Sequence, residues 1–302
     1  MPKVAERDKS CDHLFTSGHT ACPGCGQSLA VRLVLRATGR NVVVINSTGC
    51  LEIFSSKYGG SSWEVPYIHS LFENIAAVAS GVESALRTMN RLDDVRVIAM
   101  SGDGSAADIG FGAISGMMER GHDVLYVCYD NEAYMNTGIQ RSGCTPYYAR
   151  TTTSPPGKAS RGNWRPKKDL PQIILAHGVP YVATASVGYY ADLDKKVKKA
   201  LSIRGPKYLQ VHVPCPLGWG CDPSRTIDIA KMAVNSGLFP LYEVENGELK
   251  VRRIAKKVPV EEYLKLQVRF RHLFGKDGAG AEVDEIQGIA DANIEKYGLI
   301  TK

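Results

Sequence analysis

The sequence lacks any uninterrupted apolar run of about 18 to 20 residues, the length that a membrane-spanning helix requires. Its opening stretch, MPKVAERDKS, is charged and contains no apolar segment of the kind that directs a chain to export. No internal repeat, low-complexity tract or nucleic-acid-binding motif is found along the chain. We therefore expect a cytoplasmic protein that acts neither in a membrane nor on nucleic acid.

Charge of one sign is not in large excess. The 37 lysines and arginines oppose 31 aspartates and glutamates, and the resulting net charge of +6 is spread along the chain. Such a balance is only weak evidence for an acidic partner. A chain of 302 residues that is 44% hydrophobic is long enough to bury a core without disulfides or a structural metal.

Cysteine is not scarce, since the chain contains eight. Stability does not demand them, and in a reducing compartment they are expected to be thiols, metal ligands or catalytic groups rather than disulfides. They are Cys11, Cys22, Cys25, Cys50, Cys128, Cys144, Cys215 and Cys221.

Short Val- and Ile-rich runs predict strands at 42–45, 95–100 and 124–129, and each is followed by small or turn-forming residues. Small-residue-rich patterns between them predict helices at 70–90 and 105–120. Continuous apolar strands that alternate with helices are typical of a parallel sheet covered on both faces. The sequence therefore predicts a doubly wound α/β fold, in which chemistry gathers at the carboxyl ends of the strands.

The chain is expected to divide into a binding domain, residues 1–224, and a C-terminal arm, residues 225–302, that packs on the core or on another subunit. A further strand, helix and strand are predicted between residues 182 and 213. Residues 144–171 read as a long loop with five basic residues near its end. We interpret it as a solvated surface loop, with contact to an anionic substrate as the alternative.

Gly102-Asp103-Gly104-Ser105 opens a helix directly after a predicted strand. The two glycines let backbone N–H groups approach a phosphate closely, and the helix N-terminus adds partial positive charge. Asp103 would repel a diphosphate unless a divalent cation lay between them. Asn131 ends the next strand and brings a side-chain oxygen to the same sheet edge, so a Mg²⁺–diphosphate site is predicted. The alternatives are a plain tight turn and the dinucleotide fingerprint G-x-G-x-x-A, with Ala107 in the last position.

Cys22-Pro-Gly-Cys25 allows three interpretations. A thioredoxin-like redox motif would need an upstream strand, which residues 1–21 do not supply. A structural zinc site and an iron–sulfur cluster would both need two more thiolates. Spacing alone does not separate these last two.

The GDG at residues 102–104 with the distal Asn131 matches the thiamine diphosphate signature. The segment from Asn131 to Gln140, with Cys144-Thr-Pro146 beyond it, resembles the β subunit of pyruvate:ferredoxin oxidoreductase and related 2-oxoacid:ferredoxin oxidoreductases. The resemblance extends from Ser17 to Phe270 and so covers most of the chain. It implies the fold of a thiamine diphosphate-binding domain, with thiamine diphosphate, Mg²⁺ and a [4Fe–4S] cluster as cofactors.

The resemblance also implies roles for individual residues. Mg²⁺ would be held by Asp103, Asn131 and the backbone carbonyl of Ala133, and Asn136 would point at the thiazolium C2 side as the catalytic residue. The residues implied to bind the cofactor are Thr48, Gly49, Gly102, Asp103, Gly104, Ser105, Asn131 and Ala133. The implied cluster ligands are Cys22, Cys25, Cys50 and Cys215.

The remaining candidates carry weaker expectations. Cys221 is the less favoured fourth ligand, because the frame Pro-Cys-Pro-Leu-Gly-Trp points to Cys215. Cys144 stands where alanine is expected in many relatives and would place a thiol near the active-site loop. Cys11 and Cys128 are assigned to the surface and to a buried strand. His69, followed by Glu73, is either a structural histidine at a helix start or a catalytic one.

The function that the resemblance implies is CoA-acylating oxidation of a 2-oxoacid, of the EC 1.2.7 type. Pyruvate is the first expectation, with oxalate or another 2-oxoacid as alternatives; electrons pass through the cluster to ferredoxin, and the acyl unit goes to CoA. An α subunit would supply the activating glutamate and much of the substrate pocket, together with γ/δ ferredoxin-like subunits, with Glu52 and Glu73 as internal alternatives. The rival functions are a non-redox thiamine diphosphate decarboxylase or synthase with a structural zinc, and a dinucleotide-binding module.

Overall fold

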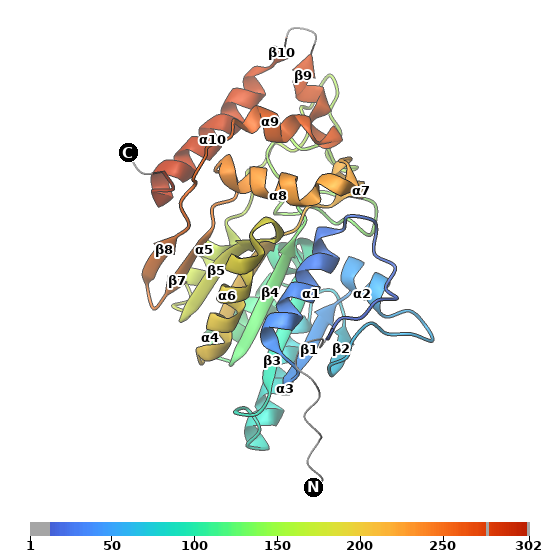
Figure 1. The fold of residues 1–302 in the computed structure, drawn as a ribbon, viewed down its shortest axis with the longest axis vertical. Helices are drawn as coiled ribbons and strands as arrows, with labels where there is room; N and C mark the ends of the chain where they lie inside the picture. The colour runs from blue at the N-terminus through green and yellow to red at the C-terminus, as the bar shows by residue number, and fades with distance from the viewer. Residues whose placement is uncertain (1–12, 276–277, 301–302) are drawn as a thin grey trace.

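The computed structural model describes residues 13–275 and 278–300, and one large sheet organises them (Figure 1). Its strands lie in the order β2-β1-β3-β4-β6-β5-β7-β8, with bounds β1 Val42–Ser47, β2 Tyr67–Ser70, β3 Arg96–Gly102, β4 Val124–Asp130, β5 Tyr181–Ser186, β6 Lys207–His212, β7 Tyr242–Glu245 and β8 Glu248–Val251. Neighbours from β2 to β5 run parallel, while β7 pairs antiparallel with β5 and β8 antiparallel with β7. A separate small pair joins β9 (Phe274–Gly275) and β10 (Gly278–Ala279).

Helices connect these strands. The α-helices are α1 Gly26–Thr38, α2 Cys50–Ser55, α3 Ile75–Thr88, α4 Phe111–Glu119, α5 Leu170–Leu175, α6 Tyr190–Ser202, α7 Pro216–Trp219, α8 Thr226–Asn235, α9 Val260–Lys265 and α10 Ala281–Tyr297. A π-helical turn, η1 (Ser105–Ile109), precedes α4, and short 3₁₀ turns are η2 (Val187–Tyr189), η3 (Pro223–Arg225) and η4 (Val268–Leu273).

Helices cover both faces of the sheet. One core joins α1, α2 and α6 to the sheet, and a second joins α3, α4 and α5 to its other face. Within β3, Ile98 and Met100 belong to the first core, whereas Val97 and Ala99 belong to the second. Burial on both faces is why these strands are continuous apolar runs in the sequence. The predicted doubly wound α/β fold is confirmed.

The C-terminal segments α7 to α10 close over the end of the sheet at which the parallel strands finish (Figure 1). A third core there unites Trp219 of α7 with apolar residues of α8, α9, η4 and α10. Residues beyond 225 therefore pack on the core of the same chain and extend its sheet through β7 and β8. The division of the chain after residue 224 stays a prediction.

The long loop differs from its expected character. It ends at Asp169, where α5 begins, and it does not lie wholly in solvent: the Nζ of Lys167 lies 2.7 Å from a carboxylate oxygen of Asp130. The reason is electrostatic, because a buried carboxylate needs a positive partner. No helix in the described part of the chain is long and apolar enough to cross a membrane.

Candidate active site

The turns after β3 and β4 bring two predicted residues together. Because β3 and β4 pair in parallel up to Gly102 and Tyr129, Asp103 and Asn131 leave the sheet at the same edge. Asp103 is fully buried; the Asn131 backbone N–H donates to one of its carboxylate oxygens at 3.3 Å, and the Ser142 hydroxyl donates to the other at 2.5 Å.

The Asn131 amide completes a cluster of polar atoms. One end of this amide lies 2.9 Å from the Ala133 carbonyl oxygen and 3.0 Å from a carboxylate oxygen of Asp103. With its nitrogen at this point, the amide donates hydrogen bonds to both. With its oxygen there, three oxygens of the types that Mg²⁺ prefers converge on one position. The predicted trio of Asp103, Asn131 and Ala133 is therefore gathered, and its donors fit a small divalent cation.

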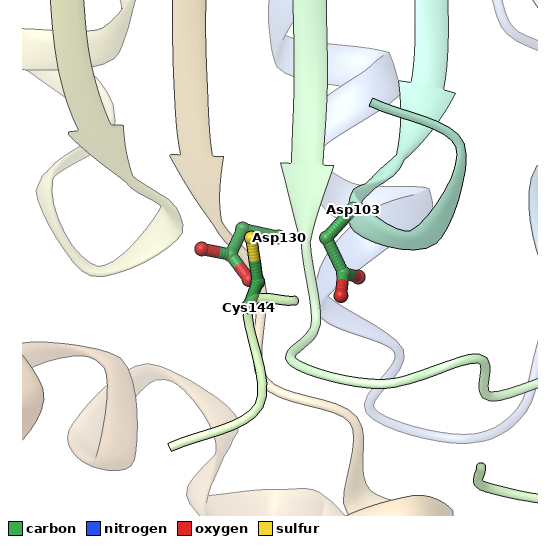
Figure 2. Close-up of side chains that lie close together, drawn as sticks. All are labelled: Asp103, Asp130 and Cys144. Atoms are coloured by element: carbon green, nitrogen blue, oxygen red, sulfur yellow. The ribbon is translucent and has the colours of Figure 1, made fainter. Parts of the chain in front are cut away.

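A second buried carboxylate stands beside this trio. Figure 2 shows Asp103 on the turn after β3, Asp130 at the end of β4 and Cys144 on the long loop, and the ligand atoms of these three residues lie within 4.8 Å of one another. Burial, and then the charge of Asp130, raise the pKa of Asp103 well above its usual range. Such a pair of carboxylates calls for positive charge between or beside them. Burial also raises the pKa of the Cys144 thiol, so it faces the carboxylates in its neutral form.

Lys167 and Arg269 supply part of that positive charge. Lys167 lies 2.7 Å from Asp130 and 2.8 Å from Glu132, and Arg269 lies 2.6 Å from the second carboxylate oxygen of Glu132. Although burial opposes ionisation of Glu132, these two cations lower its pKa to about 2. No local pattern predicts these pairs, because the loop and η4 are far from β4 along the chain.

Glycine suits the two positions of the GDG turn for different physical reasons. A Cβ on Gly104 would overlap the ring of Tyr134, so only glycine fits against that side chain. A Cβ on Gly102 would meet no atom within 4 Å, because this residue borders an open cavity. Ser105 is buried and its hydroxyl donates to the Phe72 carbonyl at 2.6 Å, which ties the start of η1 to the segment before α3.

A cavity of about 160 Å³ lies at this sheet edge. Of the predicted residues, Thr48, Gly49, Cys50, Gly102, Gly104, Asn131, Ala133 and Asn136 line it, whereas Asp103 and Ser105 lie behind its wall. The Thr48 hydroxyl is within hydrogen-bond distance of the His69 ring at 2.9 Å, so His69 sits in β2 as a support for Thr48 and not at a helix start.

Three further polar residues line the cavity and were not predicted. Gln27 Oε1, Asn46 Oδ1 and Ser47 Oγ are buried and find no hydrogen-bond partner among the residues that the structure describes. Because an unpaired buried polar atom is costly, the place of these residues in the cavity wall indicates a polar ligand in this cavity. Asn46 and Ser47 directly precede Thr48 at the carboxyl end of β1, and that position was the signal that could have identified them.

Four of the predicted cysteines form one group. Cys25 caps α1, Cys50 begins α2 and Cys215 caps α7. Burial, then the thiols of Cys25, Cys50 and Cys22, raise the pKa of Cys215 to about 12, against the hydrogen bond from the Gly218 amide. In the same way, the Cys22 thiol raises the pKa of Cys25, and the thiols of Cys25 and Cys22 raise the pKa of Cys50.

The spacing of these thiols bears on the metal. A tetrahedral zinc with bonds of about 2.3 Å places its sulfur atoms about 3.8 Å apart. In the described part of the chain, no three of these four thiols come within 4.8 Å of one another. At least one pair among any three of these thiols would therefore have to move closer together to bind a single zinc ion.

Cys128 and Cys221 are not part of this group of thiols, and Glu52 and Glu73 do not line the cavity. Arg269 and Asp222 are the charged groups that shift the pKa of the Cys221 thiol, and no cysteine of the described residues does so. Cys128 is buried in β4 as expected, and Cys11 lies outside the described residues. Neither Glu52 nor Glu73 lines the cavity, and no glutamate from the described ranges does.

Comparison with known proteins gives a consistent family. The model of the thiamine pyrophosphate enzyme C-terminal TPP binding domain, named for the same cofactor as thiamine diphosphate, matches residues 47–211. The chain is 56% identical to pyruvate synthase subunit PorB of Methanosarcina barkeri over 286 residues, covering 94% of this chain and 97% of the relative. It is 46% identical to ketoisovalerate oxidoreductase subunit VorB of Pyrococcus abyssi over 270 residues, covering 87% of each.

A solved structure supports the same family as the sequence comparisons. The fold resembles 2-oxoglutarate:ferredoxin oxidoreductase from Magnetococcus marinus, with a TM-score of 0.58 and 26% identity over 71% of this chain and 70% of that one. The family model and these relatives support the oxidoreductase interpretation over the non-redox decarboxylase and the dinucleotide-binding module. The chain belongs to the thiamine pyrophosphate enzyme family and, within it, to the β subunits of the 2-oxoacid:ferredoxin oxidoreductases.

Proposed function

We propose that this chain is the thiamine diphosphate-binding β subunit of a pyruvate:ferredoxin oxidoreductase. The observation that carries this proposal is the position of Cys50, which lines the cofactor cavity and also belongs to the group of four thiols. An electron acceptor bound there would adjoin the cofactor directly, as an oxidoreductase requires and a simple decarboxylase does not. Pyruvate is favoured because relatives at 46 to 56% identity are named pyruvate synthase subunits.

The cofactor would be held at three places. Asp103, Asn131 and the Ala133 carbonyl would bind Mg²⁺, and backbone amides at the Gly102–Ser105 turn would face the diphosphate. Gln27, Asn46 and Ser47 would give their unpaired polar atoms to the rest of the cofactor. When bound, thiamine diphosphate supplies the electron sink that makes loss of CO₂ from a 2-oxoacid feasible.

Asn136 is the proposed catalytic residue of this chain. It lines the cavity, and its side chain is close enough to the Cys50 thiol to oppose the rise that burial causes in the pKa of that thiol. An amide at this place would orient the reacting end of the substrate while fixing the adjacent sulfur ligand. Thr48 and Gly49, which precede Cys50, would form the neighbouring wall.

Cys22, Cys25, Cys50 and Cys215 are the proposed ligands of a [4Fe–4S] cluster. Besides their mutual approach, backbone N–H groups are directed at the sulfurs: Gly218 donates to Cys215 at 3.3 Å, and Gln27 and Ser28 act on Cys25. Such N–H···S contacts stabilise the negative charge of cluster thiolates. Electrons would pass from the cluster to ferredoxin.

We further propose that the active site is completed by a partner. No glutamate of the described residues lines the cavity, so the carboxylate that activates the cofactor would come from an α subunit, which would also supply much of the substrate pocket. Apolar side chains are exposed beside the cavity, with Ile53 at 49% and Leu71 at 60%, and these suit a protein interface. CoA would take up the acyl unit, and γ/δ ferredoxin-like subunits would carry electrons onward.

Cysteine substitution tests the cluster and, with it, the redox function. Cys215→Ser should remove or destabilise the cluster, whereas Cys221→Ser, the matched control, should leave it intact because no cysteine of the described residues shifts the pKa of Cys221. Iron and acid-labile sulfide are measured on anaerobically purified enzyme. Pyruvate oxidation is then compared with that of ketoisovalerate, 2-oxoglutarate and oxalate. A full iron complement in the Cys215→Ser enzyme would contradict the assignment.

A further inference from the structure

The turn between Asn131 and Ala133 has an unusual backbone. Glu132, which separates these two residues, has a φ of 70°, in the left-handed region that side chains other than glycine and asparagine rarely adopt. This conformation folds the chain back at once. It brings the Ala133 carbonyl oxygen to 2.9 Å from the Asn131 amide, and the same end of that amide lies 3.0 Å from a carboxylate oxygen of Asp103.

The Glu132 side chain is held on two sides. One carboxylate oxygen lies 2.8 Å from Lys167 of the long loop, and the other lies 2.6 Å from Arg269 of η4. The side chain is only 6% exposed, and Glu132 lines a separate cavity and not the cofactor cavity.

Arg269 also secures the turn from its other flank. Its guanidinium lies 3.8 Å from the Trp219 ring centre and donates to the Gln267 side chain at 2.8 Å. The Trp219 indole N–H in turn donates to the Asn131 carbonyl at 2.8 Å. Glu132, Arg269, Trp219 and Asn131 therefore form a closed ring of contacts around the turn.

We propose that Glu132 is a positioning residue: Lys167 and Arg269 hold its carboxylate and thereby hold the left-handed turn that presents Asn131 and Ala133 to a metal ion. This inference rests on the proposed Mg²⁺ site. It assigns to the long loop and to η4 a share in cofactor binding, although neither Lys167 nor Arg269 lines the cofactor cavity.

Two substitutions separate the backbone role from the charge. Glu132→Ala and Glu132→Gly both remove the partner of Lys167 and Arg269, but only glycine enters the left-handed region without a steric cost. In the assembled oxidoreductase we expect Glu132→Ala to weaken Mg²⁺-dependent thiamine diphosphate binding about 10- to 100-fold, as for other groups that orient metal ligands. Glu132→Gly should recover most of the affinity. Titration calorimetry gives the affinity, and iron content and melting temperature report folding.

A second pair of variants serves if the alanine enzyme does not assemble. Arg269→Met should weaken cofactor binding in the wild-type background and add nothing in the Glu132→Gly background, because glycine no longer needs the restraint. Equal losses in the alanine and glycine enzymes, or an undiminished Arg269→Met effect beside glycine, would overturn the inference. Wild-type enzyme that binds thiamine diphosphate without Mg²⁺ dependence would overturn the proposed site itself, and this inference with it.

Discussion

Replacing Gly102 by alanine should weaken cofactor binding without harming the fold. A Cβ at this position meets no protein atom within 4 Å, and the residue lines the cavity of about 160 Å³ beside Asn131. Alanine at a compatible backbone position stabilises a protein by about 0.4 to 1 kcal/mol, because the unfolded chain loses freedom. The same methyl group would stand where the diphosphate approaches. Overpacking of this kind costs about 1 to 3 kcal/mol, or about 5- to 150-fold in Kd.

Gly104→Ala is the matched comparison, because the clash there is with the protein. A Cβ on Gly104 would overlap the Tyr134 ring, whose hydroxyl donates to Asp108 at 2.9 Å and so resists displacement. We expect a loss of about 1 to 3 kcal/mol in the free energy of unfolding of the cofactor-free chain. The two variants should thus fail in opposite ways.

Urea unfolding of the cofactor-free chain and calorimetric titration of the assembled enzyme with thiamine diphosphate and Mg²⁺ distinguish the two effects. The reasoning is refuted at Gly102 if the alanine enzyme binds the cofactor as tightly as the wild type. It is refuted at Gly104 if the alanine chain unfolds at the same urea concentration as the wild type, since Tyr134 would then have room to move.

Three further predictions concern the metal site, the partner and pH. Asp103→Asn and Asn131→Ala should each abolish Mg²⁺-dependent thiamine diphosphate binding while iron content stays unchanged; unaltered affinity in both would refute the site. The isolated chain, reconstituted with cluster, Mg²⁺ and cofactor, should show no sustained 2-oxoacid decarboxylation with an artificial acceptor, and turnover would show that the activating glutamate is internal. Burial acts to raise the pKa of Asp123, but pairing with Lys207 and Arg204 outweighs burial and lowers this pKa. The stability that Asp123 contributes is therefore complete above about pH 4 and is lost as pH falls through the lower folded pKa. Asp123→Asn should flatten this loss in urea unfolding measured below about pH 4.

The sequence was sufficient to predict the buried strands but not the strands at the edges of the sheet. The strands β1, β3 and β4 are buried on both faces, so burial imposed the apolar runs that predicted them. By contrast, β2 is a partly exposed edge strand, and β8 is mostly exposed, so neither carries such a run. Their positions depend on pairing with neighbours, which no local pattern records.

The site was predictable where the chemistry is local. Asp103 and Asn131 each follow a strand, and parallel pairing brings such positions to one edge. Lys167 and Arg269 reach Glu132 from 35 and 137 positions away, and only the folded loop and η4 reveal those contacts. Gln27 was missed because a glutamine in the first turn of a helix has no distinctive pattern, and its role depends on the cavity that α1 faces.

The contact between Glu132 and Arg269 has a consequence for the order in which the site forms during synthesis. These residues are 137 positions apart, and at a translation rate of about 5 to 20 residues per second the ribosome makes Arg269 about 7 to 27 s after Glu132. During that interval the nascent chain already contains Asp103 and Asn131, but the proposed metal-binding turn lacks the guanidinium. Cofactor capture is then a late event of biogenesis, and chains that terminate before η4 compete poorly with finished subunits for thiamine diphosphate.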